Sequence, residues 1–308
     1  MPILILRRLL ILIPILIGIS ILSFVLVSLS PSDPAEVSIR VNAMVPTPEL
    51  IALTRHELGL DQPFWQRYFQ WCGAVLHGDF GQSYITGRPV AEEICEAFPP
   101  TLFLAVVTLG FILILSLPAG IICARWEAKT PDHWVRSFIF FTSAFPAFWA
   151  GLLLMWFFAV KLNWLPTSGM LSPSSVILPA ITLSLAYIST YVRLLRSEMI
   201  EASHTNWGLF ARSRGLSPLR ITLHQLLNAL RGSATALGMS IPKLMAGAFV
   251  VESIFAWPGI GRLCISAIFN RDFPIIQAYV LIMAVLFVLF NLISDLFILW
   301  LDPRERFN

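Results

Sequence analysis

Five long stretches without a charged side chain constrain this chain more than any other feature. They cover residues 9–32, 97–124, 137–160, 162–192 and 273–294. A helix that crosses a bilayer needs about 20 mostly apolar residues, and each stretch exceeds that length. A further apolar stretch, interrupted only by Lys243, also qualifies. The sequence therefore predicts six transmembrane helices, at roughly residues 9–30, 100–124, 137–160, 176–195, 233–252 and 278–300.

The overall composition agrees with a chain that has lipid as its solvent. It is 57% hydrophobic and 13% charged, whereas soluble domains carry about 25% charged residues. We expect an all-α integral membrane protein. The first apolar stretch is longer than the 7–15-residue core of a signal peptide, so we expect it to be retained as a helix.

The basic residues gather on one predicted side of the membrane. With six helices, both termini, the 125–136 connection and the 193–231 connection share a side, and this side carries thirteen Lys and Arg. Segment 31–98 on the other side has four Arg and nine acids. The positive-inside rule assigns the basic side to the cytoplasm. We therefore expect a multi-pass membrane protein with both termini cytoplasmic.

Segment 31–98 is long for a loop between two spans. It holds helix starts at 47–49 and 61–63, several aromatic residues and a glycine-rich patch at 78–81. We predict a small extracytoplasmic cap that forms one region (1–98) with the first helix, followed by a transmembrane domain (99–308). Cys72 and Cys95 both lie in region 1–98; they either form a disulfide or remain free thiols.

The sequence lacks several motifs that are typical of nucleotide binding and of catalysis. There is no GxxxxGK[ST] phosphate loop, no HExxH and no GxSxG. All five His fall outside the predicted spans, and none is paired at i,i+4 spacing to hold a metal. The predicted spans are nearly bare of the polar groups that intramembrane catalysis needs. These observations favour a conduit over a catalyst, with no catalytic or metal-ligating residue to name.

The polar connection 193–231 separates two apolar stretches. It contains six Arg, no Lys and only two acids, with an amphipathic centre near 204–216. Such a helix on the basic side can dock on a soluble partner. The alternative is an ordinary basic loop that lies on lipid headgroups.

Blocks along nearly the whole chain resemble one family, the permeases of binding-protein-dependent ABC importers, and within it the peptide/nickel group. In the polar connection the resemblance rests on ARSRGL (211–216), followed by His224 and by Asn-Ala-Leu (228–230). The other blocks are LGLDQP (58–63), GDFGQS (78–83), ESIFAWPGIGR (252–262), RDFP (271–274) and DPR (302–304). The chain departs from the family where Arg231 and Gly232 replace the usual proline and where Lys243 charges the fifth span.

The resemblance implies half of a type I importer transmembrane domain with six helices. Its partners would be a second homologous permease, two cytoplasmic ATPases and an extracytoplasmic substrate-binding protein. ATP and Mg²⁺ would bind the ATPases, and this chain would bind no cofactor.

The resemblance also assigns roles within a cytoplasmic coupling loop at 196–231. Its helix would insert into a groove on the ATPase, with Trp207 and Phe210 as apolar anchors. Arg212 and Arg214 would make charged contacts to the partner. Ala211 lies in the same block, and Gly215 would adopt a positive φ that ends the helix.

Two further groups of residues are candidates on the pathway or at its outer end. Lys243 either lines the translocation path or pairs with a carboxylate on a neighbouring helix. Trp257, Pro258 and Gly259 predict a tight turn in which the glycine permits the chain to return. With Glu252 and Asp272, this turn forms an external gate, a contact for the binding protein, or a plain re-entrant cap.

The blocks SYITG (83–87), LPTSG (165–169) and FAW (255–257) are most similar to permeases for nickel or for metal–opine metallophores. We therefore expect nickel or another divalent metal as cargo, carried as a chelate. Dipeptide and oligopeptide permeases share the broader pattern and remain the alternative. An intramembrane enzyme or an assembly factor is the alternative of another class.

Overall fold

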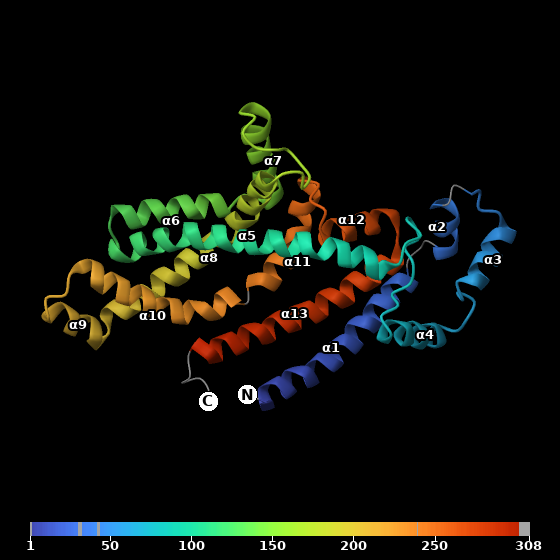
Figure 1. Ribbon diagram of the computed structural model, residues 1–308, viewed down its shortest axis with the longest axis horizontal. Coiled ribbons are helices and arrows are strands. Elements are labelled where there is room, and N and C mark those ends of the chain that lie inside the picture. The colour runs from blue at the N-terminus through green and yellow to red at the C-terminus, as the bar shows by residue number, and fades with distance from the viewer. Residues whose placement is uncertain (1, 30–32, 42–43, 239, 302–308) are drawn as a thin grey trace. The chain divides into compact units, whose positions relative to one another are not determined.

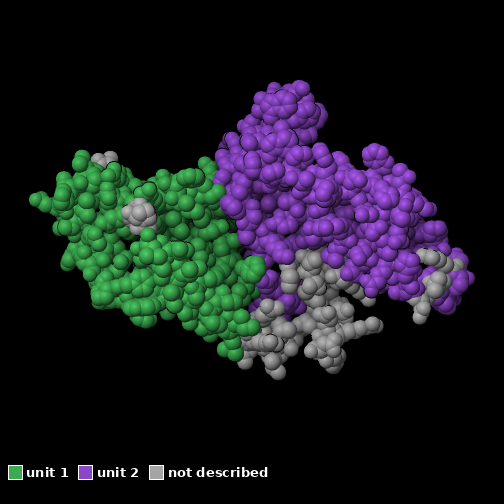
Figure 2. All heavy atoms as spheres, turned by 180° about the vertical axis from the view of Figure 1, so that it is seen from behind, with its two compact units in different colours: residues 1–101, 258–289 green, residues 102–257, 290–308 purple. Residues whose placement is uncertain are grey.

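A computed structural model describes residues 2–29, 33–41, 44–238 and 240–301 (Figure 1). Within these ranges, the side chains of 2–9, 206–207, 209, 212, 231–238 and 297–301 lie outside the description. The regular secondary structure of the described residues is helical, apart from one isolated bridge between Gln82 and Pro89. It divides into two compact units (Figure 2): unit 1 comprises Met1–Thr101 and Pro258–Leu289, and unit 2 comprises Leu102–Trp257 and Phe290–Asn308.

The helices follow one another with short connections. In chain order they are α1 (Pro2–Ser28), α2 (Pro34–Val41), α3 (Pro48–Glu57), α4 (Phe64–Leu76), α5 (Val90–Arg125), α6 (Thr130–Ser143), α7 (Ala147–Leu154), the π-helix η1 (Met155–Lys161), the 3₁₀-helix η2 (Pro173–Val176), α8 (Ile177–His204), α9 (Asn206–Ser213), α10 (Pro218–Gly238), α11 (Ser240–Ile254), α12 (Ile260–Asn270) and α13 (Phe273–Leu301).

Four described helical segments are long and apolar enough to cross a membrane: Leu10–Ser28, Val90–Arg125, Pro173–His204 and Phe273–Leu296. A fifth arises only if α6 and α7 with η1 count as one span. The expected number of six is therefore not confirmed. The predicted span 233–252 falls on the end of α10 and on α11, whose 15 residues extend about 22 Å, less than the ~30 Å hydrocarbon core.

The prediction of one continuous helix at 137–160 is wrong. Helix α6 ends at Ser143, and the axis turns by 98° before the segment Ala147–Lys161 (Figure 1). Pro146 stands at the turn with φ −58° and ψ 137°. Its ring has no amide hydrogen to donate and clashes with a preceding turn of helix, so α7 starts anew after it.

In unit 1, helix α4 packs against α1 through aromatic side chains. The Phe24 ring lies 5.3 Å from Phe64, 5.5 Å from Tyr68 and 5.7 Å from Trp71, measured between ring centroids. The Tyr68 hydroxyl forms a buried 2.7 Å hydrogen bond with Ser20. The predicted helix starts are confirmed, because α3 begins after its N-cap Thr47 and α4 after Pro63.

A second core of unit 1 joins the start of α5 to α12 and α13. Its buried members are Val90, Ile94, Ala97, Ile260, Ala267, Ile275 and Ala278. The Thr101 hydroxyl accepts the amide hydrogen of Ile260 at 2.9 Å and fixes the first turn of α12. The start of α5, rather than the cap alone, thus organises this unit.

In unit 2, α8 is the central helix. Its candidate span is 61% buried within the chain, against 17–28% for the other three. Glycines of three other helices approach it: a Cβ at Gly120, Gly151 or Gly247 would lie 2.7 Å, 3.1 Å or 3.0 Å from a side-chain atom of α8. A larger residue at any of these positions would meet a side chain of α8, so the glycines leave room for these helices to pack on it.

Candidate functional site: the α8–α9–α10 connection

The predicted loop helix exists as α9, between α8 and α10 in unit 2 (Figure 1). The Thr205 hydroxyl caps it by accepting the Gly208 amide hydrogen at 3.4 Å, and it donates to the Ala202 carbonyl at 2.8 Å. Thr205 itself is extended, with ψ 158°, so it separates α8 from α9. One hydroxyl therefore links the end of α8 to the start of α9.

Gly215 ends this helix as expected. Its φ is +72°, a left-handed conformation that glycine adopts without steric cost. The Leu216 amide donates to the Ala211 carbonyl at 3.2 Å, and the Arg214 amide donates to the Phe210 carbonyl at 3.1 Å. These bonds satisfy carbonyls at the end of α9 and turn the chain towards α10.

The described side chains of α9 divide into an inner and an outer face. Ala211 is buried, whereas Phe210 is 58% exposed. The guanidinium of Arg214 lies 5.4 Å from the centroid of the Phe210 ring, within the range of a cation–π contact. The side chains of Trp207 and Arg212 lie outside the described residues. The outer face of this connection thus presents the aromatic ring of Phe210 with the cation of Arg214 beside it.

Gly208 is a residue whose importance the sequence patterns did not reveal. A Cβ at this position would lie 2.5 Å from the Ser203 carbonyl oxygen, because the start of α9 folds back onto the last turn of α8. The signal in the sequence is one glycine near the start of an amphipathic helix, where it lowers helix propensity. The close approach of the two backbones explains it.

We predict that Gly208→Ala displaces α9 from α8 and destabilises the chain by about 1–3 kcal/mol, as expected for overpacking. Thermal unfolding in mild detergent and ATP-driven uptake by the assembled complex would both decrease. Gly73→Ala in α4 is the matched control, since its Cβ meets nothing within 4 Å. Equal behaviour of the two variants would contradict this account of Gly208.

A buried ion pair holds α8 near this connection. Asp132 of α6 has an exposed fraction of 0%. Its Oδ1 accepts Arg196 Nε–H at 3.0 Å, and its Oδ2 accepts Arg196 Nη2–H at 2.8 Å and the Ala128 amide hydrogen at 3.1 Å. Such a fork-shaped pair is strong and directional. It fixes α6 to α8 two turns before α8 ends, and sequence reasoning had not identified it.

The residues predicted for the outer end do not lie in one compact unit. Glu252 and Trp257 belong to unit 2, whereas Pro258, Gly259 and Asp272 belong to unit 1. Glu252, Trp257 and Asp272 are buried, and Pro258 is exposed. Of these five residues, Pro258 alone is exposed in the described chain.

The predicted role of Gly259 in the turn needs correction. Gly259 is extended, with φ −100° and ψ 171°, and precedes α12 as its N-cap. The left-handed residue is Ala256, with φ 47°. The Trp257 amide donates to the Glu252 carbonyl at 2.8 Å, so the chain reverses at the end of α11. The Trp257 ring then stacks on Phe103, 6.4 Å away between centroids.

Asp272 ties the loop before α5 to the start of α13 within unit 1. Its Oδ2 accepts the Ser83 hydroxyl hydrogen at 2.5 Å, and its Oδ1 accepts the Tyr84 amide hydrogen at 3.2 Å. Burial and the charge of Asp272 raise the pKa of Tyr84 to about 12. The Tyr84 hydroxyl therefore stays protonated at every physiological pH.

Lys243 is exposed on α11. Its backbone carbonyl accepts the Tyr187 hydroxyl hydrogen at 3.1 Å. In the part of the chain that is described, its ammonium group pairs with no carboxylate. The four cysteines are free thiols, Cys72 and Cys95 included. No group of three or more His, Cys, Asp or Glu among the described residues is placed to hold a metal ion.

Two models of known protein families match this chain. Residues 116–307 match the family of binding-protein-dependent transport system inner membrane components, and residues 1–105 match the N-terminal region of such components. The chain belongs to this family. It is an inner-membrane permease of an ABC importer, a transport component and not an enzyme.

Two relatives match over nearly the full length. The permease CntB of the metal-staphylopine import system of Staphylococcus aureus (strain NCTC 8325 / PS 47) is 40% identical over 98% of this chain and 97% of its own. The permease GsiC of the glutathione transport system of Salmonella typhimurium (strain LT2) is 38% identical over 99% of both chains. Both are consistent with the peptide/nickel group that the motifs indicated.

The fold also resembles a solved structure. A chain of the inward-facing MetNI methionine ABC transporter aligns with a TM-score of 0.58 and 15% identity. The alignment covers 68% of this chain and 96% of that one. At this identity the likeness concerns the fold alone, and it supports an ABC importer transmembrane domain.

Proposed function

We propose that this permease imports nickel or another divalent metal as a chelate with an opine-type metallophore. The observation that carries the proposal is the 40% identity to a metal-staphylopine permease over 98% of the chain. A chelated metal brings its own ligands, which suits a chain whose described residues hold no cluster for a bare ion. The metal in this proposal is cargo and not a cofactor.

The permease would work with a second homologous permease, two cytoplasmic ATPases that bind ATP and Mg²⁺, and an extracytoplasmic binding protein that delivers the chelate. The thirteen basic residues of the predicted cytoplasmic side support an orientation with both termini inside. Segment 31–98 would then form the extracytoplasmic cap of the first region (1–98), next to the permease domain (99–308).

In this arrangement α9 is the element that receives the ATPase. Phe210, together with Trp207, would enter the groove of the ATPase, while Arg212 and Arg214 would make charged contacts at its rim. Ala211 packs inward and Gly215 turns the chain back, so the helix is held at both ends. The exposed Phe210 ring supports this assignment over a loop resting on lipid, because aromatic side chains dominate the energetics of protein interfaces.

At the outer end, Pro258 is the residue best placed for contact with the binding protein. Within unit 1, we assign Gly259, the N-cap of α12, to the support of that residue, and Asp272 to holding the loop before α5. Within unit 2, we assign Glu252 and Trp257 to the chain reversal at the end of α11. Lys243 is exposed and has no carboxylate partner among the described residues. It is a candidate for the translocation path, where an ammonium group attracts an anionic chelate.

The second candidate cargo is a di- or oligopeptide, which the 38% identity to a glutathione permease favours. Uptake into proteoliposomes that hold the purified complex and its binding protein decides between the two. We expect ATP-dependent accumulation of ⁶³Ni complexed with an opine-type chelator. Neither bare ⁶³Ni nor a labelled dipeptide should accumulate above the level without ATP. Uptake of the dipeptide but not of the chelate would establish the alternative.

A further inference from the structure

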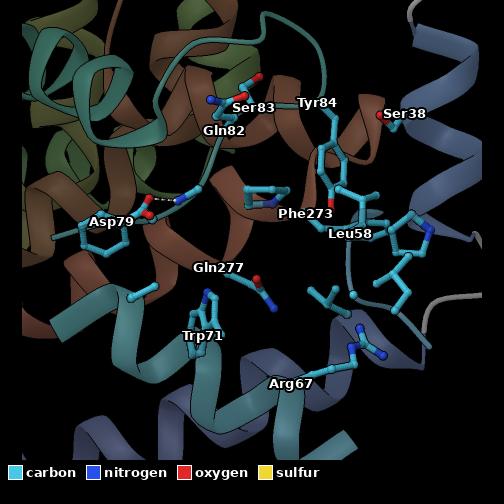
Figure 3. A pocket seen from close by; sticks show the side chains of 18 of the residues that line it. Ser38, Leu58, Arg67, Trp71, Asp79, Gln82, Ser83, Tyr84, Phe273 and Gln277 are labelled. Atoms are coloured by element: carbon cyan, nitrogen blue, oxygen red, sulfur yellow. Dashed lines mark hydrogen bonds between the residues drawn. The ribbon is translucent and has the colours of Figure 1, made fainter. Parts of the chain in front are cut away.

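Unit 1 contains a cavity of about 800 Å³ that none of the roles above employs (Figure 3). Helix α4, the loop 79–87 and the start of α13 contribute most of its walls, with the end of α1, part of α2 and residues 58–60, which follow α3. This volume lies within the 300–1,000 Å³ range of small-molecule sites. All its lining residues belong to unit 1, so its shape depends on this unit alone.

One deep polar group in this cavity lacks a partner. The Gln277 side chain is 7% exposed, and Figure 3 shows its amide projecting into the middle of the cavity. Among the described residues this amide makes no hydrogen bond. The amide atoms are open to the cavity and are not among the enclosed polar atoms that lack a hydrogen bond, so they are available to a group that enters it. A polar ligand that fills the cavity would hydrogen-bond with them.

Two opposite charges line the same cavity, and each lacks an ionic partner within the described chain. The Arg67 guanidinium lies 5.7 Å above the Phe24 ring and meets no carboxylate. Asp79 accepts the Gly81 amide hydrogen at 2.8 Å and meets no cation. Figure 3 shows Asp79 on one side of Gln277 and Arg67 on the other. The cavity thus presents a cation, a neutral amide and an anion in succession.

We propose that this cavity binds a small zwitterion derived from amino acids, with a carboxylate on Arg67 and an ammonium group on Asp79. A guanidinium presents paired N–H donors that match a carboxylate. The Gln277 amide can both donate to and accept from a peptide-like group between the two charges. Trp71 offers an apolar wall, and the protonated Tyr84 hydroxyl adds a hydrogen-bond donor. The proposal does not rest on the proposed cargo, because it is argued from the residues that line this cavity.

Equilibrium dialysis of the full-length chain in mild detergent tests the proposal, with labelled histidine, trialanine and glutathione as probes. At least one probe should bind saturably. Acetylating the amine of that probe should weaken its binding about tenfold or more, as for a lost charged hydrogen bond. Converting its carboxylate to an amide should have the same effect. Absence of saturable binding by all three probes would overturn the proposal.

The variants assign the ends of the ligand. Arg67→Gln should weaken binding of the free zwitterion about tenfold and leave binding of the amide-capped form unchanged. Asp79→Asn should weaken binding of the free zwitterion about tenfold and leave binding of the acetylated form unchanged. Gln277→Leu should weaken binding of all three forms. Arg40→Gln is the control, because Arg40 pairs with Glu36 on α2 and does not line the cavity. If Arg67→Gln instead impairs only docking of the binding protein, the cavity is a protein contact and the proposal is wrong.

Discussion

Replacing Asp132 with alanine is expected to lower the free energy of unfolding by about 3 kcal/mol, the low end of the range for breaking a buried ion pair. The variant leaves Arg196 without its partner and the Ala128 amide without its acceptor. The low end applies because the Arg196 side chain keeps 23% exposure and can reach water. Unfolding of the chain by SDS titration in mild detergent measures the change.

Two variants test whether the pair itself, rather than any charge near α6, is responsible. Arg136 also approaches Asp132, at 3.8 Å, but is half exposed, so Arg136→Gln should change stability by less than about 0.5 kcal/mol. The double variant Asp132→Ala with Arg196→Met removes both charges and should recover much of the loss. Equal stability of Asp132→Ala and the natural chain would contradict the role of the pair.

Phe210→Ala is expected to weaken retention of the ATPase subunits at least thirtyfold while leaving the fold intact. Truncating an aromatic anchor at an interface costs about 2 kcal/mol or more, whereas an exposed position contributes little to stability. Purification through a tag on the permease, with the ATPase quantified over a dilution series, measures retention. ATP-driven uptake should fall in parallel.

Leu219→Ala is the matched control for this experiment, because Leu219 is 73% exposed in the same connection but lies on α10. It should retain the ATPases like the natural chain. If Phe210→Ala also retains them, and instead reduces binding to anionic vesicles, then α9 lies on lipid headgroups and the docking proposal fails.

Local signals made part of this fold predictable. Thr47 before Pro48 is a typical helix start, and α3 begins there. A glycine after an amphipathic segment indicates a left-handed helix end, and Gly215 adopts it. The apolar stretches also identified four spans, since their lengths follow directly from the thickness of a bilayer.

Features that depend on distant residues were not predictable in this way. Asp132 meets Arg196 64 positions later, and Ser83 meets Asp272 189 positions later; no spacing rule relates such pairs. The 98° turn had one local signal, Pro146, but a proline within an apolar stretch is compatible with a kinked helix as well as with a break. At the end of α11, Ala256 adopts the left-handed conformation, and the Trp257 amide donates to the Glu252 carbonyl as the chain reverses. Gly259 stands three residues later and does not mark the position of this turn.

The glycine contacts around α8 bear on how motion can spread through unit 2. Helix α8 has 28 residues and is therefore a stiff rod about 42 Å long. At these three crossings α8 supplies the side chain, Leu195, Thr182 or Tyr187, and the neighbouring helix supplies a glycine that has no side chain to oppose it. A tilt of about 5° imposed at the α9 end would displace the opposite end by roughly 4 Å, given this length. Larger residues at Gly120, Gly151 or Gly247 would hinder this tilt through steric contact with α8.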